Sequence, residues 1–121
     1  CGGCACEIAM HRAVAEAAKS CKTVEHHAMS TFSDALLTVP QALAENSGLN
    51  AIEVVAEVKR RQVETGLTTL GVDGMQLGTN DMCEQRVFES LHAKTQQIPI
   101  VTQVVQMILK IDDVIGSSSQ D

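Results

Sequence analysis

Cysteine is the residue type in this sequence with the clearest capacity for metal or redox chemistry. Cys1 and Cys4 form a Cys-x-x-Cys pair, but a structural zinc site needs four ligands, usually from two such pairs. The other candidates have no matching spacing; they are Cys6, His11, Cys21, His26 and His27. The total of five cysteines, with Cys83, is odd, which argues against a disulfide framework. We therefore predict no metal or redox site, and interpret the cysteines as small buried residues that replace alanine or glycine.

Composition indicates one globular domain and excludes several classes of partner. Hydrophobic residues make up 45% of the 121 residues, which is an ordinary globular value. The net charge of −6 and the presence of only two aromatic residues, both phenylalanine, argue against nucleic-acid binding. No apolar run approaches the roughly 18 residues that a spanning helix needs, and no signal-peptide pattern opens the chain. The first residue is Cys1 and not Met, which we interpret as a truncated or processed start, or as a fragment of a longer chain.

The periodicity of apolar residues predicts four helices in the first half of the chain. They are expected over residues 5–20, 24–37, from Pro40 to about Asn46, and 51–64. Three apolar stripes are expected to face the core: Ile8, Ala9, Ala13, Ala17 and Ala18; Ala28, Met29, Phe32, Leu36 and Leu37; Ile52, Val55, Val58 and Val63. Glu7 and His11 fall largely outside the first stripe. Thr23 and Asn50 are expected to cap the second and fourth helices.

The second half of the chain has a different character. Three glycines and short β-leaning runs predict a small hairpin or loop over residues 67–87. A long helix is expected from about Ser90, with its start or a kink near Pro99. Ile111–Ile115 is a candidate terminal strand, which would need a partner from another subunit. The fold class is therefore mainly α, with a small β-hairpin, a C-terminal strand and a disordered tail over 116–121.

Four ordered segments carry a resemblance to a known family. They are Gly2–Glu7 (GGCACE), Leu37–Gly48 (LTVPQALAENSG), Gly71–Gly74 (GVDG) and Met107–Ile115 (MILKIDDVI). In this order they resemble the C-terminal part of a group II chaperonin subunit, the family of the archaeal thermosome and the eukaryotic chaperonin TRiC. The segments GTNDM at 78–82 and QQI at 96–98 are most similar to the epsilon subunit of TRiC. The resemblance implies that residues 1–115 are the second half of an equatorial, ATP-binding domain.

The resemblance also implies four nucleotide-binding residues. Gly3 matches the middle glycine of a turn that lies against the nucleotide, where the absence of a Cβ allows close approach. Asp73 matches an acidic position near the adenosine, and Glu89 an acidic residue that binds the ribose hydroxyls. Lys94 matches a lysine near the nucleotide in epsilon-type subunits. Three positions depart from the family pattern. Cys4 stands where the family has a glycine, and Cys6 stands at an alanine-like position. Glu89 is followed by Ser90, whereas Glu-Pro is common in the family.

Each of these residues also has a structural interpretation. Gly3 could serve only a tight turn, and Asp73 only the turn of a hairpin, where Asp-Gly is favoured. Glu89 could be a solvated carboxylate that is stabilised by the helix dipole, and Lys94 an exposed charge.

The sequence lacks the parts of the family that handle phosphate. The Gly-Asp-Gly-Thr segment and the catalytic aspartate belong to earlier segments of a family subunit, so no catalytic residue and no Mg²⁺ ligand is assigned here. ATP hydrolysis depends almost entirely on phosphate positioning and charge stabilisation. We therefore expect ATP or ADP with Mg²⁺ as cofactor of the parent complex, but no ATPase activity of this chain alone.

The resemblance implies a cytoplasmic double ring of several subunits that folds unfolded polypeptides, with clients bound by domains outside this chain. Two alternatives stay open. One is a standalone helical protein-interaction module without ATP hydrolysis, docking through Ile111–Ile115. The other is a small zinc-binding protein that uses Cys1, Cys4 and Cys6.

Overall fold

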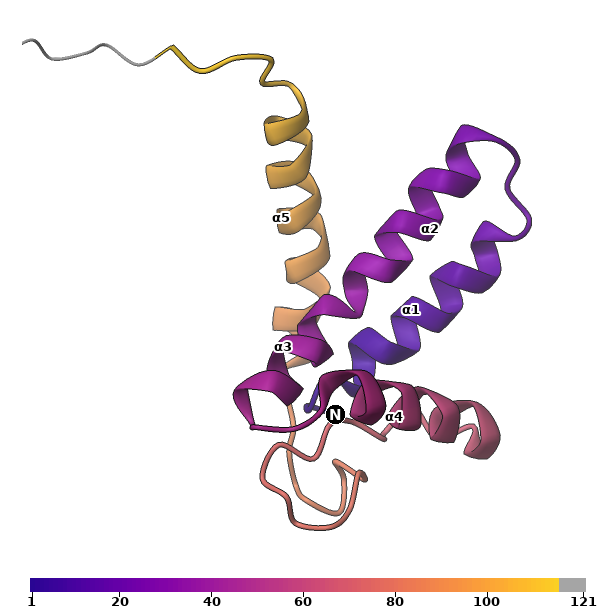
Figure 1. The fold of residues 1–121 in the computed structure, drawn as a ribbon, viewed down its shortest axis with the longest axis vertical. Coiled ribbons are helices and arrows are strands. Elements are labelled where there is room, and N and C mark those ends of the chain that lie inside the picture. The colour runs from indigo at the N-terminus through magenta and orange to yellow at the C-terminus, as the bar shows by residue number, and fades with distance from the viewer. Residues whose placement is uncertain (116–121) are drawn as a thin grey trace, which may run out of the picture. The chain divides into compact units, whose positions relative to one another are not determined.

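The computed structural model describes residues 1–115 and shows five helices joined by loops (Figure 1). Their bounds are α1 Ala5–Ala18, α2 Val24–Leu36, α3 Thr38–Asn46, α4 Ala51–Thr65 and α5 Leu91–Leu109. The chain divides into two compact units, Cys1–Phe88 and Glu89–Asp121, and each is described by itself. The mainly helical class is thus confirmed. The tail predicted over 116–121 lies outside the described residues.

The helices α1 and α2 lie side by side and are fastened by a buried polar contact (Figure 1). The Ser33 hydroxyl donates to the backbone carbonyl of His11 at 2.9 Å, and His11 Nδ1 lies 2.9 Å from the Ser33 carbonyl. From α4, the Lys59 ammonium lies 3.1 Å from His11 Nε2. The contact with the Ser33 carbonyl, which can only accept, assigns a proton to His11 Nδ1. A buried histidine is thereby satisfied on both ring nitrogens.

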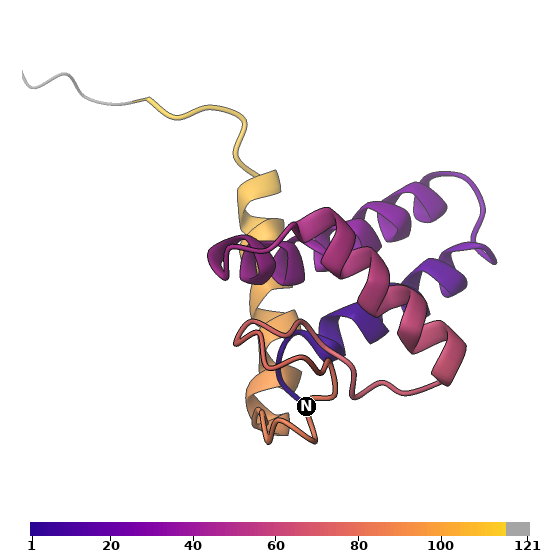
Figure 2. The ribbon, with the colours of Figure 1, turned by 60° about the horizontal axis from the view of Figure 1, so that its bottom comes forward.

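The apolar core of the first unit forms where α4 packs on α3 and on the start of α1 (Figure 2). One cluster joins Ile8 of α1, Val58 of α4 and Leu70 of the following loop. A neighbouring cluster contains Ala44, Ala51, Val55 and Val72. Gln62 lies between the elements with 1% of its surface exposed, and its amide donates to the carbonyls of Ala5 and Leu70. Gln62 therefore connects α4 to the first residue of α1 and to the loop that follows α4.

Several predicted helix faces are wrong. Glu7 and His11 are buried, although both were expected toward solvent. Ala13, Ala17, Ala28 and Phe32 are exposed. In α4, Val55 and Val58 are buried as predicted, but Ile52 and Val63 are 78% and 58% exposed. The buried face of α4 also uses the polar Gln62, which an apolar pattern cannot indicate.

The expected side-chain caps do not form. Thr23 has φ 60° and its hydroxyl donates to the carbonyl of Lys22, so it does not bond the helix that follows. Asn50 precedes α4 with no side-chain hydrogen bond to the helix. At the other ends, Gly48 and Gly66 follow α3 and α4 in the left-handed conformation, with φ 74° and 72°.

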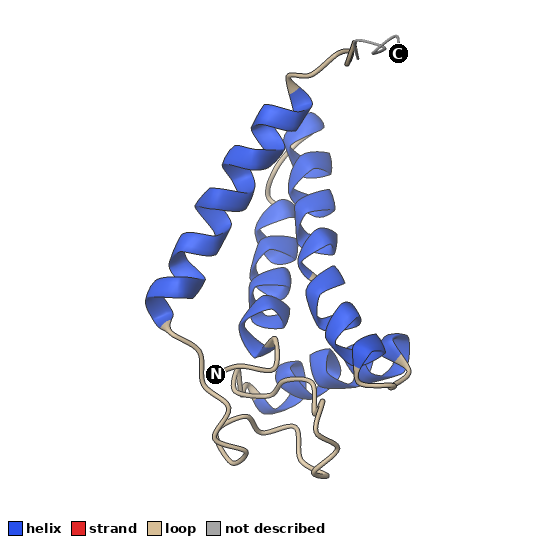
Figure 3. Cartoon of the chain, turned by 90° about the vertical axis from the view of Figure 1, so that its left-hand side faces the viewer, coloured by secondary structure: helices blue, strands red, loops and turns tan. Residues whose placement is uncertain are grey.

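The expected hairpin is reduced to one antiparallel bridge between Leu70 and Asp81, and no strand occurs within residues 1–115 (Figure 3). The Gly71 N–H donates to the Asn80 carbonyl at 2.9 Å. Beyond this point, side chains such as Asp73 bond the backbone of the loop, which competes with a strand ladder.

The second unit contains α5 and the segment that follows it. The helix begins at Leu91 and continues through Pro99, so its start lies near Ser90, as predicted, and not at the proline. No residue of α5 is buried. Residues 111–115 form no strand, because a strand needs a neighbour for its backbone groups and none is present in the described chain. No described helix combines the length and the apolar character that membrane crossing requires.

Candidate functional site

A tight glycine turn precedes α1. Gly3 and Cys4 both have φ near +60°, the left-handed region that favours glycine. The Gly3 carbonyl accepts a 2.8 Å hydrogen bond from the Val72 N–H. A Cβ placed on Gly3 would lie 2.3 Å from Met82 Sδ and 3.2 Å from the Val72 carbonyl oxygen. Both the backbone conformation and the contact with Met82 therefore favour glycine at this position.

Cys4 occupies the left-handed conformation with a side chain present. Its φ is 60° and it is half-buried, directly before the first residue of α1. Cys4 therefore adopts the conformation that favours glycine, although it carries a side chain. A left-handed non-glycine residue costs roughly 1–2 kcal/mol, so the surrounding contacts must hold Cys4 in place.

Asp73 organises the loop that meets the glycine turn. Its carboxylate accepts hydrogen bonds from the N–H of Leu77 at 3.0 Å, the N–H of Gly78 at 2.8 Å and the side-chain amide of Gln85 at 2.9 Å. Partial burial by itself raises the pKa of Asp73, but these donors and the N–H of Gln76 outweigh it and lower the pKa below its ordinary 3.8. Asp73 is therefore ionised at neutral pH and brings a negative charge to the loop.

A hollow of about 280 Å³ lies beside Asp73. It is lined by Leu49, Val54, Asp73, Gln76, Gly78 and Asn80. Apolar side chains on one side and carboxylate and amide groups on the other could hold a ligand with a flat apolar face and polar edges. The loop that forms the hollow is fastened to the turn by the bond from Val72, the residue before Asp73, to the Gly3 carbonyl.

Three further residues shape this region and had no role in the sequence-based prediction. Met82 is 1% exposed and packs against Gly3. Asn80 donates to the Gly71 carbonyl and accepts from Arg61, and Gln85 donates to Asp73. Asn80 and Met82 belong to the GTNDM segment, which was noted for its resemblance alone. The Asn80 contact with Gly71 spans 9 positions and the Met82 contact with Gly3 spans 79, so local sequence patterns do not indicate either one.

Glu89 and Lys94 lie together in the second unit. The Lys94 ammonium is 2.8 Å from Glu89 Oε2. The side chain of Lys94 is 14% exposed and that of Glu89 is 42% exposed. Glu89 precedes α5 and Lys94 lies in its first turn, where the Lys94 N–H donates to the Ser90 carbonyl. Lys94 is thus more buried than a simple surface charge, and it can orient the Glu89 carboxylate.

The structure therefore brings the four predicted residues together in two pairs. In the first unit, Gly3 is linked to Asp73 by the hydrogen bond from the N–H of Val72, the residue before Asp73, to the Gly3 carbonyl. In the second unit, Glu89 forms an ion pair with Lys94. The nucleotide roles of all four stay predictions.

The cysteines differ from the interpretation as buried small residues. Cys1 and Cys83 are exposed, while Cys4, Cys6 and Cys21 are half-buried, and all five are free thiols. Among residues 1–115, no three His, Cys, Asp or Glu side chains are grouped as metal ligands.

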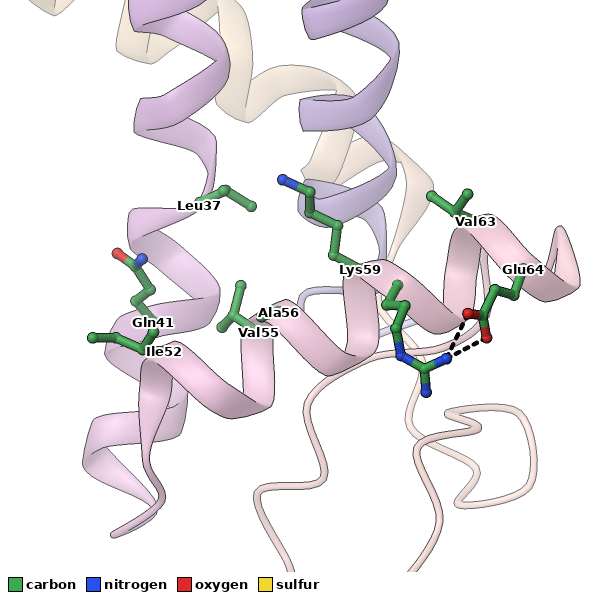
Figure 4. A pocket seen from close by; sticks show the side chains of 9 residues that line it. Leu37, Gln41, Ile52, Val55, Ala56, Lys59, Val63 and Glu64 are labelled. Carbon is green, nitrogen blue, oxygen red and sulfur yellow. Dashed lines mark hydrogen bonds and ion pairs between the residues drawn. The ribbon is translucent and has the colours of Figure 1, made fainter.

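A second, larger pocket of about 430 Å³ is lined by none of the four predicted nucleotide-binding residues (Figure 4). Its lining is Leu37, Gln41, Ile52, Val55, Ala56, Lys59, Arg60, Val63 and Glu64. The charged groups at one end are arranged along α4, where Arg60 bonds Glu57 and Glu64. The remaining lining is mostly apolar.

Comparisons with known proteins agree on one family. The sequence pattern of the TCP-1/cpn60 chaperonin family matches residues 1–119. A thermosome subunit from Methanopyrus kandleri is 39% identical over 116 residues, and one from Methanocaldococcus jannaschii is 37% identical. Each comparison covers 96% of this chain and 21% of the relative. The chain thus spans about a fifth of the length of these curated relatives.

A solved structure gives the same result at the level of the fold. The open-state monomer of a group II chaperonin from Methanococcoides burtonii is similar with a TM-score of 0.84 and 37% identity. The similarity covers 91% of this chain and 27% of that one. The relatives are thermosome subunits, so the finer resemblance to the epsilon subunit of TRiC stays a prediction. With its pattern, its relatives and its fold in agreement, this chain belongs to the TCP-1/cpn60 chaperonin family.

Proposed function

We propose that this chain supplies the adenosine-side contacts to ATP within the equatorial domain of a chaperonin subunit. Gly3 allows the backbone to approach the nucleotide, Asp73 holds the adjacent loop, and Glu89 accepts hydrogen bonds from the ribose hydroxyls. Lys94 orients Glu89 through their 2.8 Å ion pair. Two carboxylate oxygens suit two neighbouring hydroxyl donors.

The observation that carries this function is the bond between the Val72 N–H and the Gly3 carbonyl. It joins two family segments that are 69 positions apart, the glycine turn and the GVDG loop. Asp73 of the second segment lines a hollow of about 280 Å³. The family match over 1–119 supports the assignment, because both segments occur in the family order.

We assign the phosphate groups and Mg²⁺ to residues outside this chain. Mg²⁺ prefers an octahedron of oxygen ligands and is usually held by carboxylates together with substrate phosphates. The Asp73 carboxylate is already engaged by three donors, and residues 1–115 contain no group of three potential ligands. The residues described here therefore do not fit a magnesium site.

We further propose that the parent subunit works in a cytoplasmic ring with other chaperonin subunits and folds unfolded polypeptides. The thermosome relatives, of which this chain covers 21%, support this role. The test is the native mass of the particle that carries this chain, with Mg-ATP present. A ring-sized assembly with longer related subunits is expected. A species of 12.9 kDa or a small oligomer would contradict it.

Nucleotide titration tests the adenosine-side role directly. We expect saturable binding of a fluorescent ATP analogue, weakened roughly 10-fold by Glu89→Gln, because a charged acceptor for a ribose hydroxyl is lost. Glu53→Gln, an exposed first-turn carboxylate of α4, is the matched control and should leave the affinity unchanged. Equal affinity for both variants would contradict the assignment of Glu89.

The exposed apolar residues of α5 favour a second candidate, a protein-interaction module without ATP hydrolysis. Leu91, Val101 and Ile108 are 79%, 53% and 59% exposed, and the following Ile111 is 57% exposed. Large exposed apolar surfaces mark sites of association. This candidate predicts association through α5 with no saturable nucleotide binding, so the same titration separates the two.

A further inference from the structure

We propose that Cys1 and Cys83 form a redox-modification site, an intramolecular thiol pair that closes reversibly to a disulfide and fastens the glycine turn. Their Sγ atoms lie 3.3 Å apart, although the residues are 82 positions apart in the chain. A disulfide has an S–S length near 2.05 Å, so the sulfurs need to approach by only about 1.2 Å. Rotation of exposed side chains can supply a movement of this size.

The backbone on either side of the pair already holds the two cysteines together. The Gly2 N–H, next to Cys1, donates to the Val87 carbonyl at 2.9 Å. The Val87 N–H in turn donates to the carbonyl of Met82, next to Cys83, at 2.9 Å. Both cysteines belong to the first unit. The thiols are therefore brought together by hydrogen bonds that do not involve the sulfurs.

Exposure and local composition favour a disulfide over the other uses of paired cysteines. Both thiols are free and exposed, so an oxidant can reach them. A structural zinc site needs four ligands, and residues 1–115 contain no group of three. A buried role as small core residues does not apply to either. Two accessible thiols at this distance are suited to mutual oxidation.

The reaction balances with a hydroperoxide as the oxidant. One thiolate attacks the peroxide oxygen, which breaks the O–O bond and gives a sulfenic acid and one water from hydrogen peroxide. The second thiol then attacks the sulfenic sulfur, the S–S bond forms, and a second water leaves. Two electrons pass from the two sulfurs to the peroxide. A small-molecule thiol in excess reverses the step and is itself oxidised to its disulfide.

The disulfide would act on the glycine turn. It would join the residue before Gly2-Gly3 to the residue after Met82, which packs on Gly3. Opening of the turn away from the 82–87 segment would then require breaking a covalent bond. Formation of the disulfide does not need a nucleotide, so a failure of this proposal and a failure of the adenosine-side role can be told apart.

Thiol counting after oxidation tests the site. The full chain is treated with equimolar hydrogen peroxide, quenched in acid, alkylated and weighed by mass spectrometry. The five free thiols are expected to fall to three, with a cross-linked peptide that joins Cys1 to Cys83, and dithiothreitol should restore all five. Cys83→Ser should keep its four thiols. In the wild type, the Cys21 sulfur lies against Met29 and not near the pair. The control variant Cys21→Ser should therefore still form the cross-link between Cys1 and Cys83.

Amide hydrogen exchange tests the effect on the turn. Oxidation should slow exchange at the Gly2 and Val72 amides, which bond across the turn, by at least about 10-fold in the wild type and not in Cys83→Ser. Two free thiols at Cys1 and Cys83 after oxidation, sulfinic acid without a cross-link, or cross-links between chains would each overturn the proposal. Unchanged exchange in a cross-linked chain would overturn the fastening of the turn.

Discussion

Two glycines with the same backbone conformation differ in what surrounds them. Gly3 and Gly48 have φ of 61° and 74°, so an added side chain is strained at both positions. At Gly3 a Cβ would also meet Met82 Sδ at 2.3 Å, while at Gly48 nothing lies within 4 Å. The pair therefore separates backbone strain from steric exclusion.

Gly3→Ala is expected to destabilise the chain more than Gly48→Ala. The Gly48 variant should cost about 1 kcal/mol from strain alone. The Gly3 variant should cost roughly 2–4 kcal/mol, since Met82 is buried and must move. Urea unfolding of both variants measures the difference. Equal losses would mean that Met82 adjusts without cost and that the turn tolerates a side chain.

Asp73 is expected to make stability depend on pH in the acid range. Its pKa is lowered from 3.8 in the folded chain, so its contribution is present above the unfolded pKa and is lost as pH falls through the folded pKa. Asp73→Asn should cost about 1 kcal/mol at pH 7, because a charged acceptor of three hydrogen bonds becomes neutral and the site is half-exposed.

The pH profile distinguishes this effect from simple loss of packing. As the pH falls through the lowered pKa of Asp73, urea unfolding of the wild type and Asp73→Asn should converge. Asp34→Asn, an exposed aspartate of α2, should track the wild type throughout. A constant difference between wild type and Asp73→Asn from pH 7 to pH 2 would show that ionisation of Asp73 plays no part.

At the scale of elements, apolar periodicity and turn residues predicted where helices occur but not which faces they bury. The bounds of α2 and α4 agree with the predicted 24–37 and 51–64 to within one residue. The buried faces were missed where polar groups enter the core, as His11 does by bonding Ser33. The partner is 22 positions away, so nothing in the local sequence indicates it.

The candidate site was predicted through family segments and not through local chemistry. Gly3 and Asp73 could be named from their motifs, and the structure brings their segments together. Gln85 and Met82 could not be named, since their roles arise from contacts to Asp73 and Gly3 across the fold. The expected hairpin failed for a related reason, because the Asp73 carboxylate takes the backbone donors of the loop that a strand ladder would use.

The contact between α1 and α2 is expected to depend on Ser33. Ser33→Ala removes the hydroxyl that donates to the His11 carbonyl in a buried site, and should cost roughly 1–2 kcal/mol. Ser30→Ala, at a half-buried serine of the same helix, should cost less than about 0.5 kcal/mol. Thermal unfolding of both variants provides the comparison. A loss in Ser30→Ala as large as that in Ser33→Ala would mean that general packing of α2, and not this bond, fastens the two helices.

At the scale of the whole molecule, the chain is proposed to supply one part of the ATP site of a chaperonin subunit. The thermosome relatives are about five times as long, and the phosphate-binding Gly-Asp-Gly-Thr segment does not occur in these 121 residues. The side chains proposed to meet ATP are those suited to its adenosine end. We therefore expect this chain to separate ATP binding from ATP hydrolysis.

The 121-residue chain alone is expected to bind ATP without hydrolysing it. Phosphoryl transfer needs groups that position the γ-phosphate and stabilise its charge, and adenosine contacts alone do not lower that barrier. Phosphate release from Mg-ATP should therefore equal the buffer rate, in the wild type and in Glu89→Ala alike, while Glu89→Ala weakens nucleotide binding. A substantial rate that is lost in Glu89→Ala would show that this chain carries its own phosphate-handling groups. A rate that persists in Glu89→Ala at unchanged binding would point to a contaminating ATPase, which a second purification would remove.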